Sequence, residues 1–339
     1  MSPVVRAIDL GYGNVKFTRG IDGNGDFMFD MFPSFAPLAN KSDLGDGVLT
    51  QRDTIIVSVR GVDYEVGRDA KIAAGTERSR VLHEDYIEQP QYMALTLGAL
   101  KLMAEPVIDI LVVGLPVSLY ERKKSRLQEI LTGVHEVDKA GGLVEVKSVV
   151  VVPQPLGGMI SYARGDGGMG WSEIMHQSCL TVDVGYFTFD WLFTNGVKNV
   201  ESKSGAYNTG VSKILQAVAH SVGTNLDIPN YDDLDAVDLG LREGSAKIYG
   251  KPHDFAIYQE IVNKIAADSV STMKNRVGDG RDLDRIVIVG GGAFLYGETV
   301  KQSYPRNEVA IINNGIYANV MGYLIIGNDK AKKLKNASA

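Results

Sequence analysis

The sequence contains only one cysteine, Cys179, and no apolar run near the roughly 18 to 20 residues that a membrane-spanning helix needs. A disulfide within the chain is therefore excluded. Because Cys179 stands beside the predicted strand 180–182, we expect it to be a small core residue rather than a nucleophile. The first residues also lack the basic and apolar segments of a signal peptide, so we expect a cytoplasmic protein with no membrane partner.

Positive charge is also scarce, with 35 lysines and arginines against 41 acidic residues and a net charge of −6. This balance argues against a protein that coats nucleic acid, because such surfaces are strongly basic. The five histidines show no spacing typical of metal ligands. With 339 residues, of which 45% are hydrophobic, the chain is long enough for about two globular domains.

Two short motifs, about half the chain apart, each begin with an aspartate and carry a glycine turn. Residues 9–16 read DLGYGNVK and residues 183–190 read DVGYFTFD. β-Branched residues before each aspartate predict a strand, and glycine lets the backbone turn back. The N–H groups of such a turn can bind anionic oxygen. One aspartate from each motif could hold Mg²⁺, which needs only one or two carboxylates beside water and phosphate oxygens.

A single turn of this kind is a common hairpin with no ligand. Two of them are followed here by the apolar strand 286–289 and the glycine run 290–292. The requirements of folding alone do not explain two such turns together with this strand and glycine run. The sequence therefore predicts a nucleotide site.

Alternating strand and helix patterns predict two strand-first halves, which indicates an internal duplication. A strand-rich insertion is expected at about 30–85, a surface loop at 34–53 and a glycine loop at 165–170. The basic helix 119–131 suits either a partner surface or a solvated face. The helices predicted after the first hairpin are 92–103, 119–131, 209–221, 257–274 and 316–326. The predicted strands are 27–32, 55–59, 62–66, 108–113, 144–152, 197–202 and 285–289.

Over nearly the whole chain, these motifs resemble the actin-like ATPases, most closely the plasmid-segregation branch known as ParM or StbA. The resemblance implies an α/β fold of two duplicated, ribonuclease-H-like domains with a nucleotide cleft between them. Domain I would comprise residues 1–155 and 315–339, with the small subdomain at 30–85, and domain II residues 156–314. Connecting helices would begin near residues 153 and 314.

The resemblance also implies ATP or ADP with Mg²⁺ as the ligand. Asp9 and Asp183 would hold the metal through water, and Gln154 would orient the attacking water, so these three residues are the predicted catalytic set. The two hairpins would contact the phosphates and the glycine run the adenosine. The predicted nucleotide contacts are Gly11, Tyr12, Gly13, Asn14, Lys16, Gly185, Tyr186, Phe187, Thr188, Arg242, Glu243, Gly290, Gly291, Gly292 and Ala293.

The chain departs from the family pattern at both turns. Tyr12 stands where relatives often have Ser or Thr, and Tyr186 and Phe187 replace small residues. We expect the bulky groups of the second turn to reshape the pocket around the terminal phosphate, so that hydrolysis is slower or is coupled differently to assembly. Gln154 is a neutral amide, which favours positioning of water over general-base catalysis.

The function implied is a filament-forming ATPase that partitions plasmid DNA. ATP would close the cleft, subunits would add head to tail, and hydrolysis would weaken their contact. A separate DNA-binding adaptor of the ParR type would join the filament to DNA, without direct contact between this chain and nucleic acid. One alternative is a sugar- or acetate-type kinase of the same superfamily, with Asp190 as the candidate acceptor-binding aspartate. A heat-shock-type chaperone is less favoured, because no peptide-binding domain follows residue 330.

Overall fold

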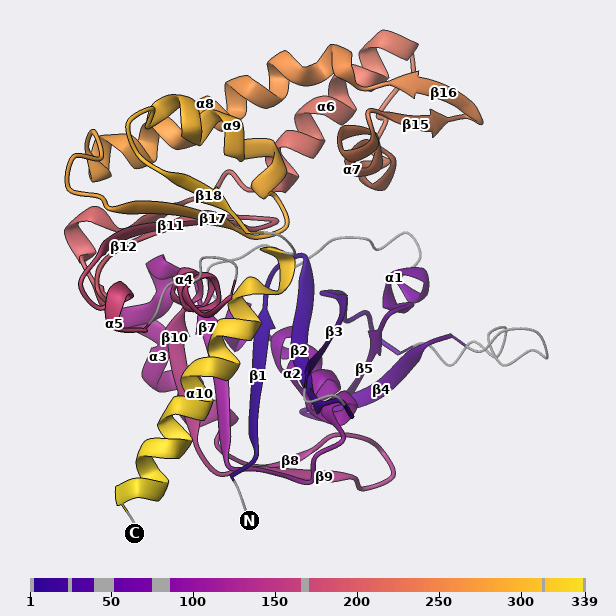
Figure 1. Ribbon diagram of the computed structural model, residues 1–339. Coiled ribbons are helices and arrows are strands. Elements are labelled where there is room, and N and C mark those ends of the chain that lie inside the picture. Colours follow the sequence, from indigo (N-terminus) through magenta and orange to yellow (C-terminus); the bar gives the residue numbers. More distant parts are fainter. Residues whose placement is uncertain are drawn as a thin grey trace. The chain divides into compact units, whose positions relative to one another are not determined.

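The computed structural model describes residues 3–23, 26–39, 52–74, 86–165, 171–312 and 315–337. Two compact units can be distinguished by their internal contacts: residues 1–169 with 316–339 form unit 1, and residues 170–315 form unit 2 (Figure 1). Most of the predicted loop at 34–53 and of the glycine loop at 165–170 lies outside the described residues.

Unit 1 contains a five-stranded sheet in the order β10-β7-β1-β2-β3. β1 is antiparallel to β2 and parallel to β7, and β7 is parallel to β10. β7 is buried along its whole length, because helices cover both faces of the sheet. The strands are β1 (Val5–Leu10), β2 (Asn14–Ile21), β3 (Phe27–Pro33), β7 (Ile110–Leu115) and β10 (Val149–Pro153).

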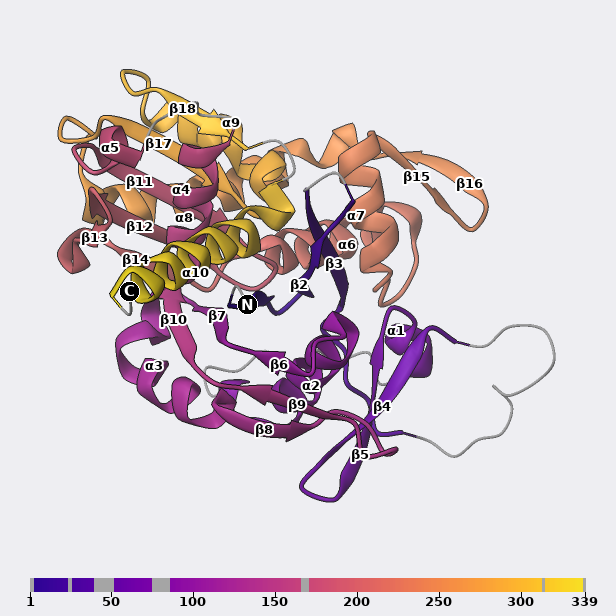
Figure 2. The same ribbon diagram turned by 60° about the horizontal axis from the view of Figure 1, so that its bottom comes forward.

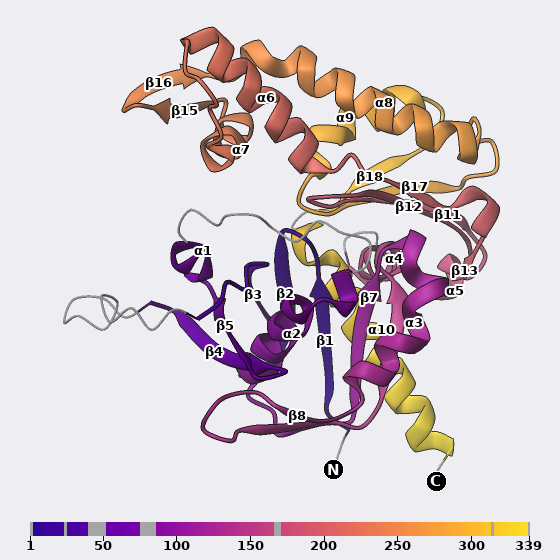
Figure 3. The same ribbon diagram turned by 180° about the vertical axis from the view of Figure 1, so that it is seen from behind.

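The helices of unit 1 divide between the two faces of this sheet. α2 (Pro90–Met103) and α3 (Val117–Leu131) pack on one face, and α10 (Ala318–Ala337) packs on the other, with α4 (Gln154–Arg164) against it (Figures 1 and 3). The basic side chains of α3 form ion pairs with acidic neighbours at the surface, as between Lys123 and Glu88 and between Arg126 and Glu129. This arrangement favours a solvated face.

Smaller elements surround the first sheet (Figure 2). The predicted strand 144–152 is wrong as a single element, because the chain changes sheets at residues 147–148, where Lys147 turns outward to pair with Asp109 at 2.8 Å. The elements are the hairpin β4 (Thr54–Val59) and β5 (Val62–Gly67), the short helices α1 (Ala70–Ala73) and η2 (Tyr86–Glu88), and the sheet of β6 (Val107–Ile108), β9 (Leu143–Val146) and β8 (Gly133–Glu136).

Unit 2 repeats the strand order of unit 1. Its sheet runs β13-β12-β11-β17-β18, and β14 also pairs with β12. In both units the first strand lies between an antiparallel and a parallel neighbour: β1 between β2 and β7, and β11 between β12 and β17. This is the pattern expected of a duplication. The strands are β11 (Ser178–Val184), β12 (Phe189–Asn195), β13 (Lys198–Asn199), β14 (Gly205–Tyr207), β17 (Arg285–Val289) and β18 (Val309–Ile311).

Three helices of unit 2 share one core with its sheet: α6 (Val211–Leu226), α8 (Gln259–Val277) and α9 (Ala293–Ser303). Cys179 lies in β11 and is confirmed as a core residue, and burial raises the pKa of its thiol to about 11. The short helices of unit 2 are α5 (Trp171–Ile174), η3 (Glu201–Lys203) and η4 (Ala256–Tyr258). The chain returns to unit 1 within η5 (Gly315–Tyr317).

Two stretches of unit 2 differ from the sequence-based expectation. The predicted strand 197–202 is reduced to β13, because the Val200 N–H makes the last bond to β12, to Phe193 O, and the chain then enters η3 at Glu201. Residues 225–253, for which no regular element was expected, form α7 (Leu234–Glu243) and the hairpin of β15 (Ser245–Ile248) and β16 (Lys251–Asp254). The Asp233 carboxylate caps α7 by accepting from Ala236 N at 3.0 Å.

Glycines bring α4 and α10 into backbone contact. A Cβ atom added to Gly322 would lie 1.9 Å from Gly157 O, and one added to Gly157 would lie 2.5 Å from Asn319 O. These contacts place α4 in unit 1, whereas the sequence-based boundary at 155/156 assigns most of it to domain II. That division into domains stays a prediction. Among the helices that the structure describes, none is both long and apolar enough to span a bilayer.

Candidate functional site

The first aspartate motif forms the hairpin between β1 and β2. Asp9 pairs with Lys16 and Leu10 with Val15, and the turn is closed by the Gly11 N–H, which donates to Asn14 O at 3.2 Å. The Gly13 carbonyl accepts from Ser34 N at 3.0 Å. The Gly11 N–H, predicted as a phosphate contact, thus already donates within the hairpin, and this hydrogen bond sets the shape of the turn.

The carboxylate of Asp9 is the centre of a polar cluster inside unit 1. Asp9 is 1% exposed, Lys16 Nζ lies 2.9 Å from its Oδ2, and Gln154 Nε2 donates to its Oδ1 at 3.2 Å. Three elements bring these groups together, since Lys16 lies on β2 and Gln154 is the first residue of α4. The ammonium group offsets part of the cost of burying the carboxylate. The structure therefore joins three of the predicted site residues, although their roles toward a nucleotide stay predictions.

Aromatic side chains hold the first turn on the core. The ring of Tyr12 stacks on Tyr86 with centroids 5.0 Å apart, and Tyr86 meets Tyr92 edge-on at 5.3 Å. Burial, together with the negative charge of Asp9, raises the pKa of the Tyr92 phenol well above its usual range. Sequence reasoning missed Tyr86 and Tyr92, because they follow the turn by more than 70 positions and only folding brings them to it.

The second aspartate motif forms an equivalent hairpin in unit 2. Asp183 pairs with Asp190 and Val184 with Phe189, and the Gly185 N–H donates to Thr188 O at 3.0 Å. Register and turn bond thus repeat those of the first hairpin. Asp183 is 7% exposed. Asp190 is buried within the sheet, which gives the kinase alternative no support.

The N-terminus of α6 fixes the second turn from behind. The N–H groups of Gly210 and Ser212 donate to Phe187 O and Tyr186 O at 2.9 and 2.8 Å. A Cβ atom on Gly210 would lie 2.6 Å from Gly185 O, so only glycine fits there. These bonds occupy N–H groups that a helix start would otherwise leave unsatisfied. Sequence reasoning missed Gly210, although a glycine directly before a helical pattern is a usable signal.

The glycine run lies directly against the end of β11. Gly290 has a φ of 89°, and a Cβ atom there would lie 2.6 Å from Asp183 Oδ1. The Gly292 N–H donates to Val184 O at 3.0 Å. Because a side chain at residue 290 would collide with the carboxylate, glycine is needed for this close approach. The structure thus brings the second motif and the glycine run together, with Ala293 as the first residue of α9.

Arg242, at the end of α7, reaches the same glycine run. Its Nη2 donates to Gly291 O at 3.2 Å, its Nε donates to Asp238 at 2.9 Å, and its guanidinium lies 4.2 Å from the ring centroid of Phe294. Phe294 is 41% exposed. Sequence reasoning missed this ring, although an aromatic residue two positions after a glycine run is a signal. Glu243, the other predicted adenosine contact, is exposed at the end of α7.

Within the described ranges, no group of three or more His, Cys, Asp or Glu side chains could hold a metal ion. An ion at Asp9 or Asp183 would therefore need water molecules and phosphate oxygens as its other ligands. That coordination is the one Mg²⁺ prefers.

Both halves of the chain match families of actin-like proteins. Residues 7–157 match the family described as actin like proteins N terminal domain, and residues 181–302 match archaeal actin homologue MreB-like, C-terminal. No curated protein sequence matches the chain.

Solved structures of actin homologues share the fold. The archaeal actin homologue Ta0583 superposes with a TM-score of 0.77 at 19% identity, covering 98% of this chain and 99% of that one, and its complex with ADP gives 0.74 at 17% identity over 97% and 99%. Apo pSK41 ParM gives 0.71 at 18% identity over 99% and 100%. A 15-stranded ParM filament from Clostridium botulinum gives 0.71 at 20% identity over 97% and 100%.

Proposed function

This chain is an actin-like protein, and on that premise we propose that it binds and hydrolyses ATP with Mg²⁺ and that ATP binding drives its assembly into filaments. The duplication carries the proposal, because each unit presents the same turn with an aspartate at the same register. The glycine run beside Asp183 adds a third element. Two relatives support it, one seen with ADP and one as a filament.

In this proposal one Mg²⁺-nucleotide contacts both hairpins. Asp9 and Asp183 hold the metal through water, and Lys16 moves from Asp9 to share the phosphate charge. The bound metal neutralises charge that develops on the phosphates. The turns 11–14 and 185–188 position the phosphate chain, and because α6 and the Tyr12–Tyr86 stack already fix them, little order is lost on binding.

The adenosine lies, in the proposal, at the glycine run beside Arg242 and Phe294. The guanidinium and the ring form a flat, partly exposed surface, and a Cβ atom on Gly291 would meet nothing within 4 Å. Stacking on such a surface suits an aromatic base, and Glu243, the residue after Arg242, is proposed as the ribose contact.

Replacing Arg242 with alanine is expected to weaken ADP binding about tenfold, because one side of the stacking surface is lost. Titration calorimetry measures the change. Arg281→Ala is the matched control, since Arg281 is also an exposed arginine of unit 2 with an ion pair to an aspartate. Equal affinity in the wild type and the Arg242 variant would place the base elsewhere.

Replacing Gln154 with alanine is expected to slow ATP turnover at least tenfold while ADP affinity changes less than about twofold. A residue that orients the attacking water acts mainly in the transition state. Gln128→Ala is the control, because this glutamine also donates through Nε2 at 3.2 Å in unit 1, but to Val149 O. A loss of ADP affinity would instead assign Gln154 a structural role through its bond to Asp9.

The filament is tested by sedimentation and electron microscopy with ATP, GTP and ADP in parallel. We expect polymer with the triphosphate and disassembly as it is consumed. Protein that binds ATP yet stays monomeric at high concentration would reject this part of the proposal. For segregation, we propose a separate DNA-binding adaptor of the ParR type, in keeping with the net charge of −6.

A further inference from the structure

The turn between β15 and β16 carries a tyrosine that folding does not explain. Tyr249 and Gly250 form a two-residue turn with φ values of 48° and 77°. Such turns favour Asn or Gly, and a bulky residue with positive φ costs about 1 kcal/mol. Tyr249 is 82% exposed, the largest exposed fraction among the large hydrophobic side chains in the described ranges. Because the ring is exposed, few contacts within the subunit compensate for that cost. Strain of this kind is typical of a residue that binds a partner.

The surroundings of Tyr249 are basic. Lys247 and Lys251 flank the turn on the two strands, and both are exposed. Neither lysine forms an ion pair with another residue in the described part of the chain. The tip therefore presents one aromatic ring between two positive charges, and its partner should offer an apolar hollow with carboxylates at its edge.

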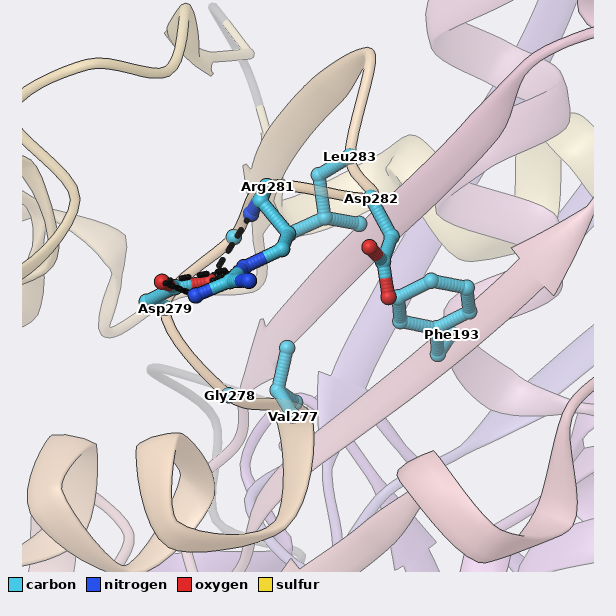
Figure 4. A pocket seen from close by; sticks show the side chains of 8 residues that line it. Phe193, Val277, Gly278, Asp279, Arg281, Asp282 and Leu283 are labelled. Atoms are coloured by element: carbon cyan, nitrogen blue, oxygen red, sulfur yellow. Dashed lines mark hydrogen bonds and ion pairs between the residues drawn. The ribbon is translucent and has the colours of Figure 1, made fainter.

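A hollow of that kind lies elsewhere in unit 2 (Figure 4). It has a volume of about 440 Å³ and is lined by the end of α8, the loop 278–283 and β12. Its apolar residues are Phe193, Val277 and Leu283, its acidic residues are Asp279 and Asp282, and Arg281 is its one basic lining residue. The volume is sufficient for one aromatic side chain.

The two carboxylates of the hollow remain open to further donors. Arg281 binds Asp279 in a two-pronged pair, with Nη2 to Oδ2 at 2.7 Å, and Lys203 Nζ lies 2.6 Å from Asp282. Both aspartate side chains are nonetheless 57% exposed. A carboxylate accepts several hydrogen bonds, so each can take a lysine from outside in addition to its present partner.

The tip and the hollow lie at opposite ends of α8. The hairpin precedes the first residue of α8, and Val277, its last residue, lines the hollow. A helix of 19 residues spans roughly 28 Å, and Figures 1 and 3 show the hairpin beyond one end of it. Tip and hollow of one chain therefore do not meet. Between copies, such a contact is head to tail, and unless it closes into a ring it repeats into an open filament.

We propose that the Tyr249 tip of one subunit docks into the hollow at Asp279 and Asp282 of a second copy of this chain. The ring takes the place beside Phe193 that the Lys203 ammonium holds in the free subunit, 4.6 Å from the ring centroid. Lys247 and Lys251 pair with the two carboxylates. The contact rests on the proposed function, since it supplies the longitudinal bond of the filament.

Two variants test the contact. Tyr249→Asn removes the ring and places at that position a residue that tolerates positive φ, so its melting temperature should equal or exceed that of the wild type. Asp282→Lys places a positive charge in the hollow. We expect each variant to bind ADP like the wild type and to raise the critical concentration for ATP-dependent assembly at least tenfold, because buried aromatic anchors dominate interfaces.

A mixture of the two variants gives the sharpest outcome. Tyr249→Asn keeps an intact hollow and Asp282→Lys keeps an intact tip, so with ATP the mixture should form a one-to-one dimer that neither forms alone, measured by analytical ultracentrifugation. Normal assembly of Tyr249→Asn would assign the tip to another partner and overturn the contact. So would the absence of that dimer while both variants bind ADP. A wild type that binds no nucleotide and does not polymerise would overturn the proposed function as well.

Discussion

Replacing Asp183 with asparagine is expected to lower Mg²⁺-dependent ATP turnover at least a hundredfold while leaving the fold intact. Asparagine has nearly the same shape, so the close approach of Gly290 is preserved. It lacks the negative charge with which the proposed site holds the metal's water shell, and electrostatic positioning provides most of the catalysis in phosphoryl transfer. Phosphate release at varied Mg²⁺ concentration measures the loss.

The control for this variant is Asp284→Asn. Asp284 also forms a hydrogen bond with β11, but at the end of the strand opposite to Asp183. There its carboxylate accepts from Ser178 N at 2.7 Å. Turnover should stay within about twofold of the wild type there, with a similar melting temperature. Unchanged turnover in the Asp183 variant would remove this aspartate from the metal site, and a large fall in its melting temperature would assign it a structural role.

Replacing Gly322 with alanine is expected to lower the free energy of unfolding by about 3 kcal/mol or to prevent folding. The new Cβ atom would lie 1.9 Å from Gly157 O, which is backbone and cannot rotate away, so α4 and α10 would have to separate. Separation of the two helices would also weaken the packing of Tyr323 over Gly114. Urea unfolding followed by circular dichroism measures the change.

Gly297→Ala provides the contrast within another helix. Its Cβ atom would lie 2.6 Å from Ile311 Cδ1, the flexible end of a side chain that is 40% exposed. That atom can move aside, and alanine favours a helix interior by up to about 1 kcal/mol, so little or no stability should be lost. Equal stability of the Gly322 variant would contradict the direct contact between α4 and α10.

The features predicted well from the sequence are those set by neighbouring residues. The strand 285–289 is confirmed at both ends, because a β-branched run meets a glycine that must take a positive φ. Both aspartate hairpins form where predicted, since strand and turn signals lie within a few positions of each other. The actin-like fold is confirmed as well, because the same local pattern occurs twice.

The features that could not be predicted depend on distant parts of the chain. No local signal joins Arg242 to Phe294 or Tyr12 to Tyr86, since packing alone brings each pair together. The break between β9 and β10 rests on two polar residues within a valine-rich run, which periodicity does not distinguish from a continuous strand. The α7 region was missed although Leu234, Val237 and Leu241 form an apolar stripe that packs on the core of unit 2, because this stripe is short and stands among acidic residues. β15 also alternates buried and exposed residues, but over only four positions.

Unit 1 is assembled from two pieces of chain separated by the whole of unit 2. During synthesis, β1 and β7 leave the ribosome with Val5, Ala7 and Val112 on a face that waits for α10. Unit 2 is continuous and can complete its core first, whereas unit 1 closes only when the last helix arrives. A ribosome stalled before residue 318 would therefore present that bare face to chaperones, and a released chain would not.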